Sequence, residues 1–261
     1  MKRILLSGAA LFTLIGAAQA ADLPRPAPPP PAMLVQVPYT WTGFYVGGAF
    51  GYGVWDMNSS VVTPGGVVGT TNNGGRGWVG QAVAGYDYQF AVASFNLVAG
   101  VFGDYSFGNM EGTSNFQAAN ENPNALGGFS ASTLTGVEKE RDYWDVGARI
   151  GWLVTPQILS YFNGGYTEAR FDGMTLAPLG GAMSTSSNTY HGWFTGGGVE
   201  TQIASVPGLF FNTEYRFSSY SSATLPVAGS GGALGTSISL KLQPNVQTVM
   251  SGLRYKFNWG P

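Results

Sequence analysis

Residues 41–53 read WTGFYVGGAFGYG, and they decide the fold because large and small side chains alternate along them with a two-residue period. A strand of a soluble sandwich buries its bulky face, but here aromatic residues stand at both ends of the apolar run, as in strands that cross a bilayer. We therefore interpret this stretch as the first strand of a transmembrane β-barrel. The bulky face consists of Phe44, Val46, Phe50 and Tyr52, and the small face consists of Gly43, Gly47, Ala49 and Gly51.

The composition of the chain agrees with a barrel and excludes several other classes. The 261 residues include 40 Gly, 44% are apolar, and only 10% are charged, which is unlike a disordered chain. The absence of Cys excludes disulfides, thiolate metal sites and a cysteine nucleophile. Because the formal net charge is -2, no basic face indicates a nucleic-acid partner.

The N-terminal residues predict export. Lys2 and Arg3 precede an apolar run over residues 4–18, and Ala18-Gln19-Ala20 is a small-residue pattern after which signal peptidase cuts. We expect residues 1–20 to be a signal peptide. Since no other stretch is apolar over the length of a spanning helix, an exported membrane protein of this sequence must cross the bilayer as a closed barrel.

Residues 21–40 predict a proline-rich periplasmic linker that leads into a barrel domain over residues 41–261. Seven prolines between residues 24 and 38 impose extended polyproline geometry and remove backbone donors. Proline-rich tracts are usually spacers, and a docking segment for a partner is the alternative.

Eight runs of strand type follow the linker, and their lengths suit a tilted crossing of ~9 to 11 residues with some projection beyond the membrane. A ten-stranded barrel is the alternative if residues 129–137 form part of an additional hairpin. The eight runs are residues 41–52, 78–90, 95–107, 141–154, 158–171, 190–203, 209–220 and 246–257.

The connections between these runs alternate in length. Residues 91–94, 155–157 and 204–208 are short enough for tight turns. The other connections are long and rich in Gly, Ser, Thr and Asn. An even strand number with this alternation predicts an all-β, eight-stranded antiparallel barrel of a Gram-negative outer membrane, with periplasmic turns and termini and with extracellular loops. The long connections are residues 53–77, 108–140, 172–189 and 221–245.

Charged residues share one face of the predicted strands. Along residues 141–154, for example, Trp144 and Ile150 alternate with Asp145 and Arg149. An Arg or Lys that faces lipid at the midplane costs about 2–4 kcal/mol, so the charged face must be the interior. Since side chains fill the interior of an eight-stranded barrel, we expect a packed ionic network, with the gate of a narrow pore as the alternative. The expected members are Asp87, Asp104, Asp145, Arg149, Glu200, Glu214, Arg216, Arg254 and Lys256, and the small face of the first strand leaves room for Arg254 and Lys256.

Six segments resemble the small outer-membrane β-barrel family of alphaproteobacteria, which includes major surface antigens and haemin-binding proteins. That family is similar to the transmembrane barrel of outer membrane protein A, and the resemblance covers residues 41–257. It implies a surface protein that the barrel assembly machinery inserts, with haemin or a host surface as a ligand. The segments are WTGFYVGGAFGYG (41–53), GVFGDYSF (100–107), YWDVGARIGW (143–152), GWFTGGGVE (192–200), FNTEYRF (211–217) and SGLRYKF (251–257).

The resemblance also implies site residues and shows two departures. The inward acids of the family correspond to Asp104, Glu200 and Glu214. Phe102 stands where relatives often carry an inward acid, and four residues follow Phe257, the aromatic residue on which such barrels usually end. Phe257 or Trp259 is then the expected assembly signal.

His191 is the only histidine, and it stands at the expected outer end of its strand. A general base needs a nucleophile and an orienting acid, and no G-x-S-x-G motif supplies them, so we expect neither an enzyme nor a bound cofactor. A haem-ligand role is the alternative, although Tyr190 and Trp193 beside it suit the interfacial aromatic belt equally well.

These features favour a structural surface barrel that supports the integrity of the envelope. A narrow porin-like channel for small solutes and a haemin-binding or adhesive surface protein are the alternatives. Outer-membrane lipid, lipopolysaccharide and the barrel assembly machinery are the expected partners.

Overall fold

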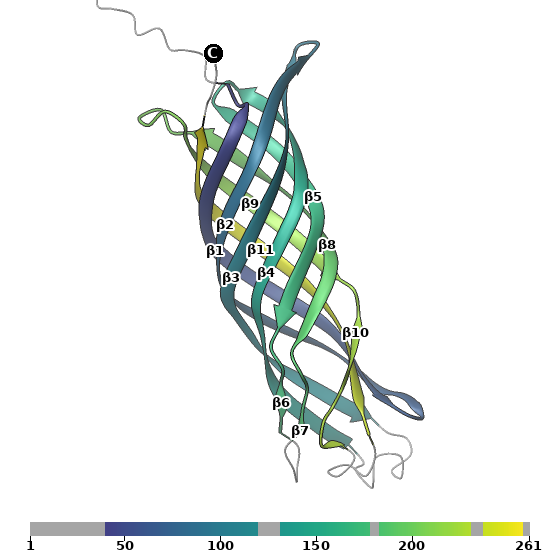
Figure 1. Cartoon of the computed structure of the whole chain (residues 1–261). Coiled ribbons are helices and arrows are strands. Elements are labelled where there is room, and N and C mark those ends of the chain that lie inside the picture. Colours follow the sequence, from purple (N-terminus) through teal and green to yellow (C-terminus); the bar gives the residue numbers. More distant parts are fainter. Residues whose placement is uncertain (1–39, 120–130, 178–182, 231–236, 258–261) are drawn as a thin grey trace, which may run out of the picture. The chain divides into compact units, whose positions relative to one another are not determined.

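The computed structural model describes residues 40–119, 131–177, 183–230 and 237–257, and nearly all of them lie in β-strands (Figure 1). Within this part of the chain, no helix is long and apolar enough to cross a membrane. The strands are β1 (Gly43–Thr63), β2 (Gly66–Val92), β3 (Phe95–Ala119), β4 (Ala131–Thr155), β5 (Ile158–Phe171), β6 (Thr175–Leu176), β7 (Met183–Ser184), β8 (Asn188–Gln202), β9 (Leu209–Tyr220), β10 (Ala223–Pro226) and β11 (Ser239–Phe257).

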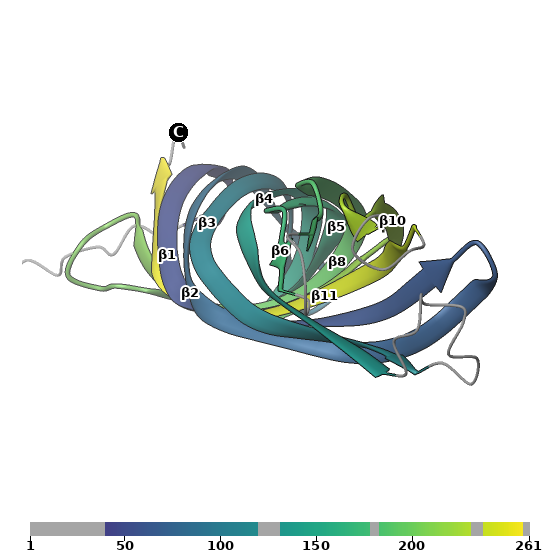
Figure 2. The same cartoon turned by 90° about the horizontal axis from the view of Figure 1, so that it is seen from below.

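Eight of these strands form a closed antiparallel barrel in the order β1-β2-β3-β4-β5-β8-β9-β11. The ring closes because β1 pairs with β11 in one continuous register, from Phe44 opposite Phe257 to Val62 opposite Ser239 (Figure 2). Closure removes both free edges of the sheet over this length. The predicted eight-stranded barrel is therefore confirmed.

The remaining strands are short and lie at one end of the barrel. Strand β10 pairs with the first residues of β11, and β6 and β7 pair with each other. Residues 131–137, for which a separate hairpin was the alternative, continue β4 and pair with β3.

Three tight turns lie at the opposite end of the barrel, which we call the turn end (top of Figure 1). They connect β2 to β3, β4 to β5 and β8 to β9, as the sequence predicts. Ala93 has a φ of 53° and Gly208 a φ of 83°, because these turns need left-handed backbone. We call the other end, where β6, β7 and β10 lie, the loop end.

The strands extend much further toward the loop end than the sequence predicts. The expected loop over residues 53–77 is instead a hairpin of β1 and β2 with only Pro64 and Gly65 between them. Strands β3 and β4 likewise continue through residues 108–119 and 131–140. Gly, Ser, Thr and Asn predict loops, but here pairing with neighbouring strands fixes them in the sheet.

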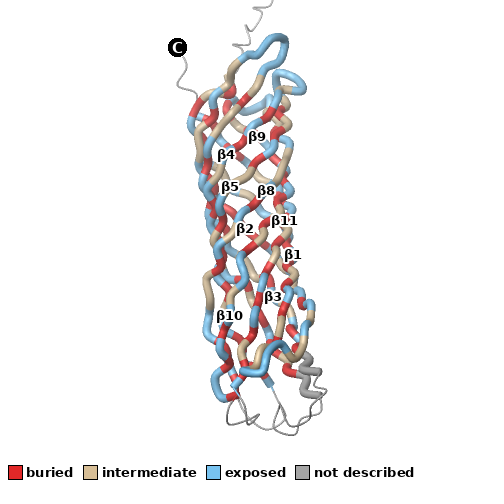
Figure 3. Tube along the Cα trace, turned by 90° about the vertical axis from the view of Figure 1, so that its right-hand side faces the viewer, coloured by how far each residue is buried: buried red, intermediate tan, exposed pale blue. Residues whose placement is uncertain are grey.

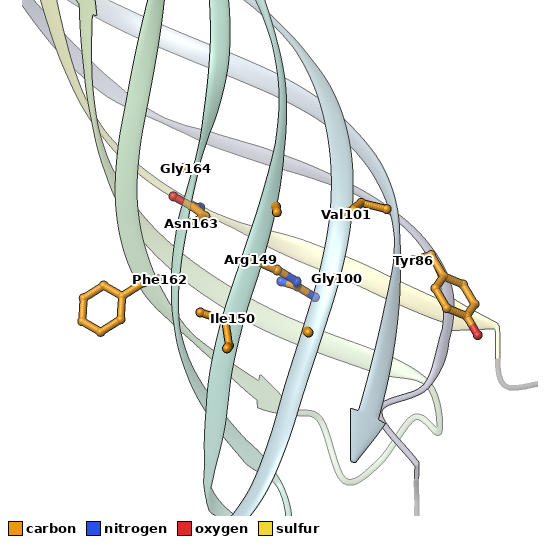
Figure 4. Close-up of a pocket in the computed structure, with 10 residues that line it drawn as sticks. Tyr86, Gly100, Val101, Arg149, Ile150, Phe162, Asn163 and Gly164 are labelled. Carbon is orange, nitrogen blue, oxygen red and sulfur yellow. The ribbon is translucent and has the colours of Figure 1, made fainter. Parts of the chain in front are cut away.

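Buried and exposed positions alternate along the strands (Figure 3). The exposed positions between the turn end and the middle of the barrel carry large apolar side chains, such as Phe50, Trp152 and Phe211. One shallow groove on this surface has Ala99, Ala148 and Gly164 among its lining residues, and Tyr86 and Phe162 project away from the sheet on either side of it (Figure 4). The face that the sequence predicts to meet lipid is therefore exposed on the outside of the barrel.

Three groups of buried apolar side chains follow one another from the turn end to the loop end. The first is Trp41, Val98, Leu159, Tyr161 and Phe210, and the second is Tyr45, Val83, Phe102 and Phe194. The third, which we call the outer cluster, consists of Trp55, Met57, Val61, Val79, Met110, Phe116, Leu134, Tyr143, Ala169, Phe171, Met174, Leu176, Met183, Tyr190, Tyr220, Leu225, Val227, Ile238, Leu240, Leu242, Val246 and Met250.

Trp41 differs from its expected place in the first strand. Strand β1 begins two residues later, and Trp41 is fully buried at the turn end. Its backbone N–H donates to Oε1 of Gln89 at 2.9 Å, and its indole N–H donates to the carbonyl oxygen of Pro156 at 3.1 Å. These bonds fix the indole across the end of the barrel interior.

Candidate functional site

The nine charged residues that the sequence predicts to point inward are all buried in the barrel interior. We call them the ionic network, because each forms at least one ion pair with another member. They come from six strands: Asp87 from β2, Asp104 from β3, Asp145 and Arg149 from β4, Glu200 from β8, Glu214 and Arg216 from β9, and Arg254 and Lys256 from β11.

Arg149 joins two acids from opposite parts of the barrel wall. Its Nε donates to Oδ1 of Asp87 at 2.8 Å and a terminal nitrogen donates to the other Asp87 oxygen, so this pair is bidentate. The second terminal nitrogen donates to Glu200 at 3.0 Å. The rings of Tyr45 and Tyr161 have their centroids 4.7 and 5.1 Å from the guanidinium carbon. A bidentate pair with cation-π contacts gives Arg149 a fixed geometry.

Lys256 lies on the turn side of Arg149 and pairs with the same two acids. Its Nζ is 2.6 Å from Asp87 and 3.2 Å from Glu200. The ring of Trp41 is 4.4 Å from Nζ, and the ring of Phe210 is 5.1 Å from it. The ammonium group is therefore covered by aromatic rings at the turn end of the barrel.

Arg254 links these residues to the rest of the ionic network. One terminal nitrogen is 2.9 Å from Glu200, and the other is 3.3 Å from Glu214. The hydroxyl of Tyr161 also donates to Glu214 at 2.7 Å.

Arg216 forms ion pairs with the three acids nearest the middle of the barrel. Its terminal nitrogens pair with Glu214 at 2.7 Å and Asp104 at 3.0 Å, and one of them also pairs with Asp145. The phenyl rings of Phe194 and Phe102 lie 4.6 and 5.6 Å from its guanidinium carbon. Phe102, which departs from the family pattern, thus supplies an aromatic face to Arg216.

Glycines on the small face of β1 make room for β11, although only one of the two expected side chains uses that room. A Cβ at Gly47 would lie 2.8 Å from Cγ of Arg254. At Gly51 the neighbour is Met250, whose Cγ would lie 2.8 Å from a Cβ. Lys256 instead lies against Trp41 and Tyr45.

The outer cluster fills the interior between the ionic network and the loop end, and the sequence analysis does not predict it. Many of its residues lie in segments that were expected to be loops, such as Met57, Phe116, Leu134 and Leu240. Residues 238–246 do carry the pattern of a strand, because apolar side chains alternate with polar ones there. Together, the ionic network and the outer cluster occupy the interior over most of the strand length.

Glu138 and Glu140 are two further interior acids, and the sequence pattern does not predict them. Their side chains lie among those of the outer cluster, 2% and 1% exposed. From Tyr143 toward the turn end, odd-numbered residues of β4 point inward. A register shift between Glu140 and Asp142 makes even-numbered residues point inward on the loop side. Continued strictly, the alternation around Trp144 would place both glutamates outside.

His191 lies on the outer surface of the barrel, where its side chain is 60% exposed. Its Nδ1 is 2.7 Å from the hydroxyl of Tyr166 and 3.2 Å from a carboxylate oxygen of Glu168. Its ring stacks on that of Tyr166 with centroids 6.3 Å apart. The structure therefore does not bring His191 together with the ionic network.

Comparison with known proteins shows which proteins this chain resembles. No protein-family model matches it. It is 26% identical to the 31 kDa outer-membrane immunogenic protein of Brucella melitensis over 98% of this chain and 100% of that protein, and equally similar to the same protein of Brucella suis. The structure resembles the outer membrane protein OprG of Pseudomonas aeruginosa, with a TM-score of 0.54, 14% identity, and coverage of 83% and 97% of the two chains. The protein is an outer-membrane β-barrel.

For this outer-membrane β-barrel, the turn end is periplasmic and the loop end is extracellular. A weaker likeness in fold, with a TM-score of 0.49 and 9% identity, is to the outer membrane protease OmpT of Escherichia coli, over 82% of this chain and 97% of that one. Exposed charged side chains, including Glu111, Lys139 and Arg141, mark where the barrel leaves the membrane on the extracellular side. Glu138 and Glu140 alternate with Lys139 and Arg141 along β4, so they lie at the level of these exposed charges.

Proposed function

We propose that this protein is a closed structural barrel that supports the integrity of the outer membrane. The proposal rests on the observation that side chains occupy the barrel interior. The ionic network spans the barrel interior with paired charges, and the outer cluster adds an apolar layer between this network and the loop end. A permeant ion would have to displace paired charges that water does not reach, which costs several kcal/mol for each charge left unpaired.

The extracellular extension supports a role at the cell surface. Strands β1 to β4 project beyond the charged boundary near Arg141, where β1 pairs with β2 and β3 pairs with β4. The similarity to immunogenic outer-membrane proteins of Brucella suggests the same kind of surface exposure.

Three further assignments belong to this proposal. We propose that residues 1–20 are a signal peptide and that residues 21–40 are a periplasmic linker; apart from Thr40, they lie outside the described residues. We also propose that Phe257, the last residue of β11, is read by the barrel assembly machinery. Trp259, the alternative, lies outside the described residues.

The structural role can be tested by measuring how readily detergents and large antibiotics cross the cell envelope. A strain without this protein should admit detergents and large antibiotics more readily, and wild-type protein should restore the barrier. If the strain kept its barrier but took up small solutes more slowly, the protein would act as a channel and the proposal would be wrong.

Replacing His191 with Ala should leave the affinity for haemin unchanged. The imidazole is exposed, and the groups within hydrogen-bond distance of Nδ1 are Tyr166 and Glu168, so no interior haem pocket includes it. Haemin titration of the refolded barrel, followed by absorption of the haem, measures the affinity. A tenfold loss in the variant, with the same loss absent in Tyr166→Phe, would make His191 a haem ligand instead.

A further inference from the structure

The outer cluster contains two carboxyl groups without a cationic partner. Glu138 accepts one hydrogen bond, from the hydroxyl of Ser114 at 3.2 Å. Neither oxygen of Glu140 has a hydrogen-bond partner, and neither glutamate forms an ion pair within the described part of the chain. Every acid of the ionic network, in contrast, has at least one Arg or Lys within ion-pair distance.

The groups that face these carboxyls are neutral or acidic. Glu138 interacts with Ser114 of β3 and Tyr190 of β8. Glu140 is next to Met110 of β3 and Phe171 of β5 in the sheet. Its electrostatic neighbours are Asp142, Tyr143 and Asp145 of β4 and Tyr220 of β9.

Burial without a cation favours the neutral form of both carboxyl groups. Burial raises the pKa of Glu138 to about 7, although the hydrogen bond from Ser114 opposes the shift. Burial and the nearby charges of Asp145 and Asp142 raise the pKa of Glu140 to about 8. In an open state, where water reaches them, both would titrate near the ordinary value for Glu.

Glu138 lies beyond the last residue of β4 that pairs with β5, and Glu140 is that last residue. Toward the loop end, residues 111–119 and 131–139 form a hairpin of β3 and β4, which we call the outer hairpin. Pairing of β4 with β5 ends at Glu140, and pairing of β3 with β2 ends at Glu111. Beyond these points few bonds join the hairpin to its neighbours: Asn115 N–H to Asn73 at 2.8 Å, Asp172 N–H to Lys139 at 2.9 Å, and Ala177 N–H to Thr135 at 2.9 Å.

We propose that Glu138 and Glu140 form a proton-dependent latch that holds the outer hairpin closed over the barrel interior. When both carboxyls are neutral, they pack within the outer cluster. When they ionise, the carboxylates must reach water, and the outer hairpin moves away from the interior. The ionic network on the turn side of the outer cluster keeps its own ion pairs. The movement is therefore confined to the extracellular half of the barrel. This regulation goes beyond the proposed structural role and does not depend on it.

The direction of the pH effect follows from linkage. A group whose pKa is higher in the closed state than in the open state stabilises the closed state fully below its open-state pKa. It loses that contribution as the pH rises through its closed-state pKa. For Glu140, raising the pH from about 6 to about 9 should increase the ratio of open to closed barrel roughly a hundredfold, and Glu138 adds a further factor of roughly ten.

Methionine oxidation measures the opening directly. Met57, Met110, Met174 and Met183 are buried in the outer cluster. In full-length protein refolded into liposomes, their oxidation by hydrogen peroxide, followed by mass spectrometry, should accelerate steeply between pH 6 and pH 9. In Glu140→Gln the acceleration should fall to roughly tenfold, and in the double variant with Glu138→Gln it should vanish.

Glu111→Gln is the matched control, because it removes an exposed carboxylate of the outer hairpin that pairs with Lys139 at 3.4 Å. This variant should keep the full pH dependence of the wild type. Equal oxidation of the wild type at pH 6 and pH 9 would overturn the proposal, and so would an equal acceleration in Glu140→Gln and wild type. If the Gln variants do not refold, the wild-type comparison alone still decides, because a closed outer cluster at pH 9 contradicts the latch.

Discussion

Replacing Arg149 with methionine should lower the free energy of unfolding by about 3–5 kcal/mol, because it leaves two buried acids short of their shared cation. Asp87 would keep only Lys256, and Glu200 would keep Lys256 and Arg254. The methionine side chain fills part of the same volume, so the loss should come mainly from the missing ion pairs with Asp87 and Glu200. Urea titration of the barrel in liposomes, followed by tryptophan fluorescence, measures the change.

Two further variants separate charge pairing from a general effect of losing an arginine. Arg141→Met removes an exposed guanidinium whose contact with Asp172 is 3.9 Å, and it should change stability by less than about 1 kcal/mol. Adding Asp87→Asn to Arg149→Met removes the acid that has lost one of its two cations and should recover part of the loss. An Arg149→Met barrel as stable as the wild type would mean that the ionic network does not stabilise the fold.

Replacing Trp55 with alanine should cost about 3–5 kcal/mol, since it empties a large volume in the outer cluster. The indole is 2% exposed, donates to the carbonyl oxygen of Met110 at 3.2 Å, and meets the ring of Phe171 edge-on with centroids 6.1 Å apart. A Cβ at Gly75 would lie 2.5 Å from this ring, so the backbone of β2 also packs closely against it. The same urea titration measures the loss.

Trp78→Ala is the matched control for Trp55→Ala. Trp78 faces lipid, 43% exposed, beside Phe50 and Phe107. Because lipid can fill the space that Trp78 leaves, its loss should cost clearly less than that of Trp55. Equal losses in the two variants would indicate that the outer cluster is loosely packed and does not close the barrel.

The membrane-spanning part of this fold could be predicted from the sequence because lipid imposes a strict alternation there. Residues such as Trp144, Val146 and Ile150 must face hydrocarbon, so the parity of each strand is visible in its sequence. The same parity assigns Asp145 and Arg149 to the interior. It could not show which acid meets which base, because Arg149 and Asp87 are 62 residues apart and meet only after the barrel closes.

The extracellular half could not be predicted in the same way. Outside the membrane no lipid requires apolar side chains on the outer face, so residues 58–60 and 70–74 show no apolar alternation although they lie in strands. Cross-strand pairing, which involves distant residues, holds them in the sheet. The outer cluster forms only when those strands close, so no single stretch of sequence predicts it.

The position of Glu138 and Glu140 shows how one irregularity changes the result of a parity argument. The register shift between Glu140 and Asp142 exchanges the two faces of β4, and nothing in the local composition marks it. A single-sequence pattern assigns such residues to the wrong face wherever a bulge interrupts the strand.

In the closed barrel that we propose, three layers formed by the described residues block the interior. Trp41 covers Lys256 at the periplasmic end, the ionic network spans the membrane level, and the outer cluster with its two glutamates fills the extracellular end. Loosening one layer leaves the others in place, so Trp55→Ala alone should not produce a pore.

Single-channel recording in planar bilayers tests this closure most directly. Wild-type barrel at about pH 6 should show no steady open state, and neither should Trp55→Ala. A steady conductance of the wild type would contradict closure and identify a pore through the ionic network.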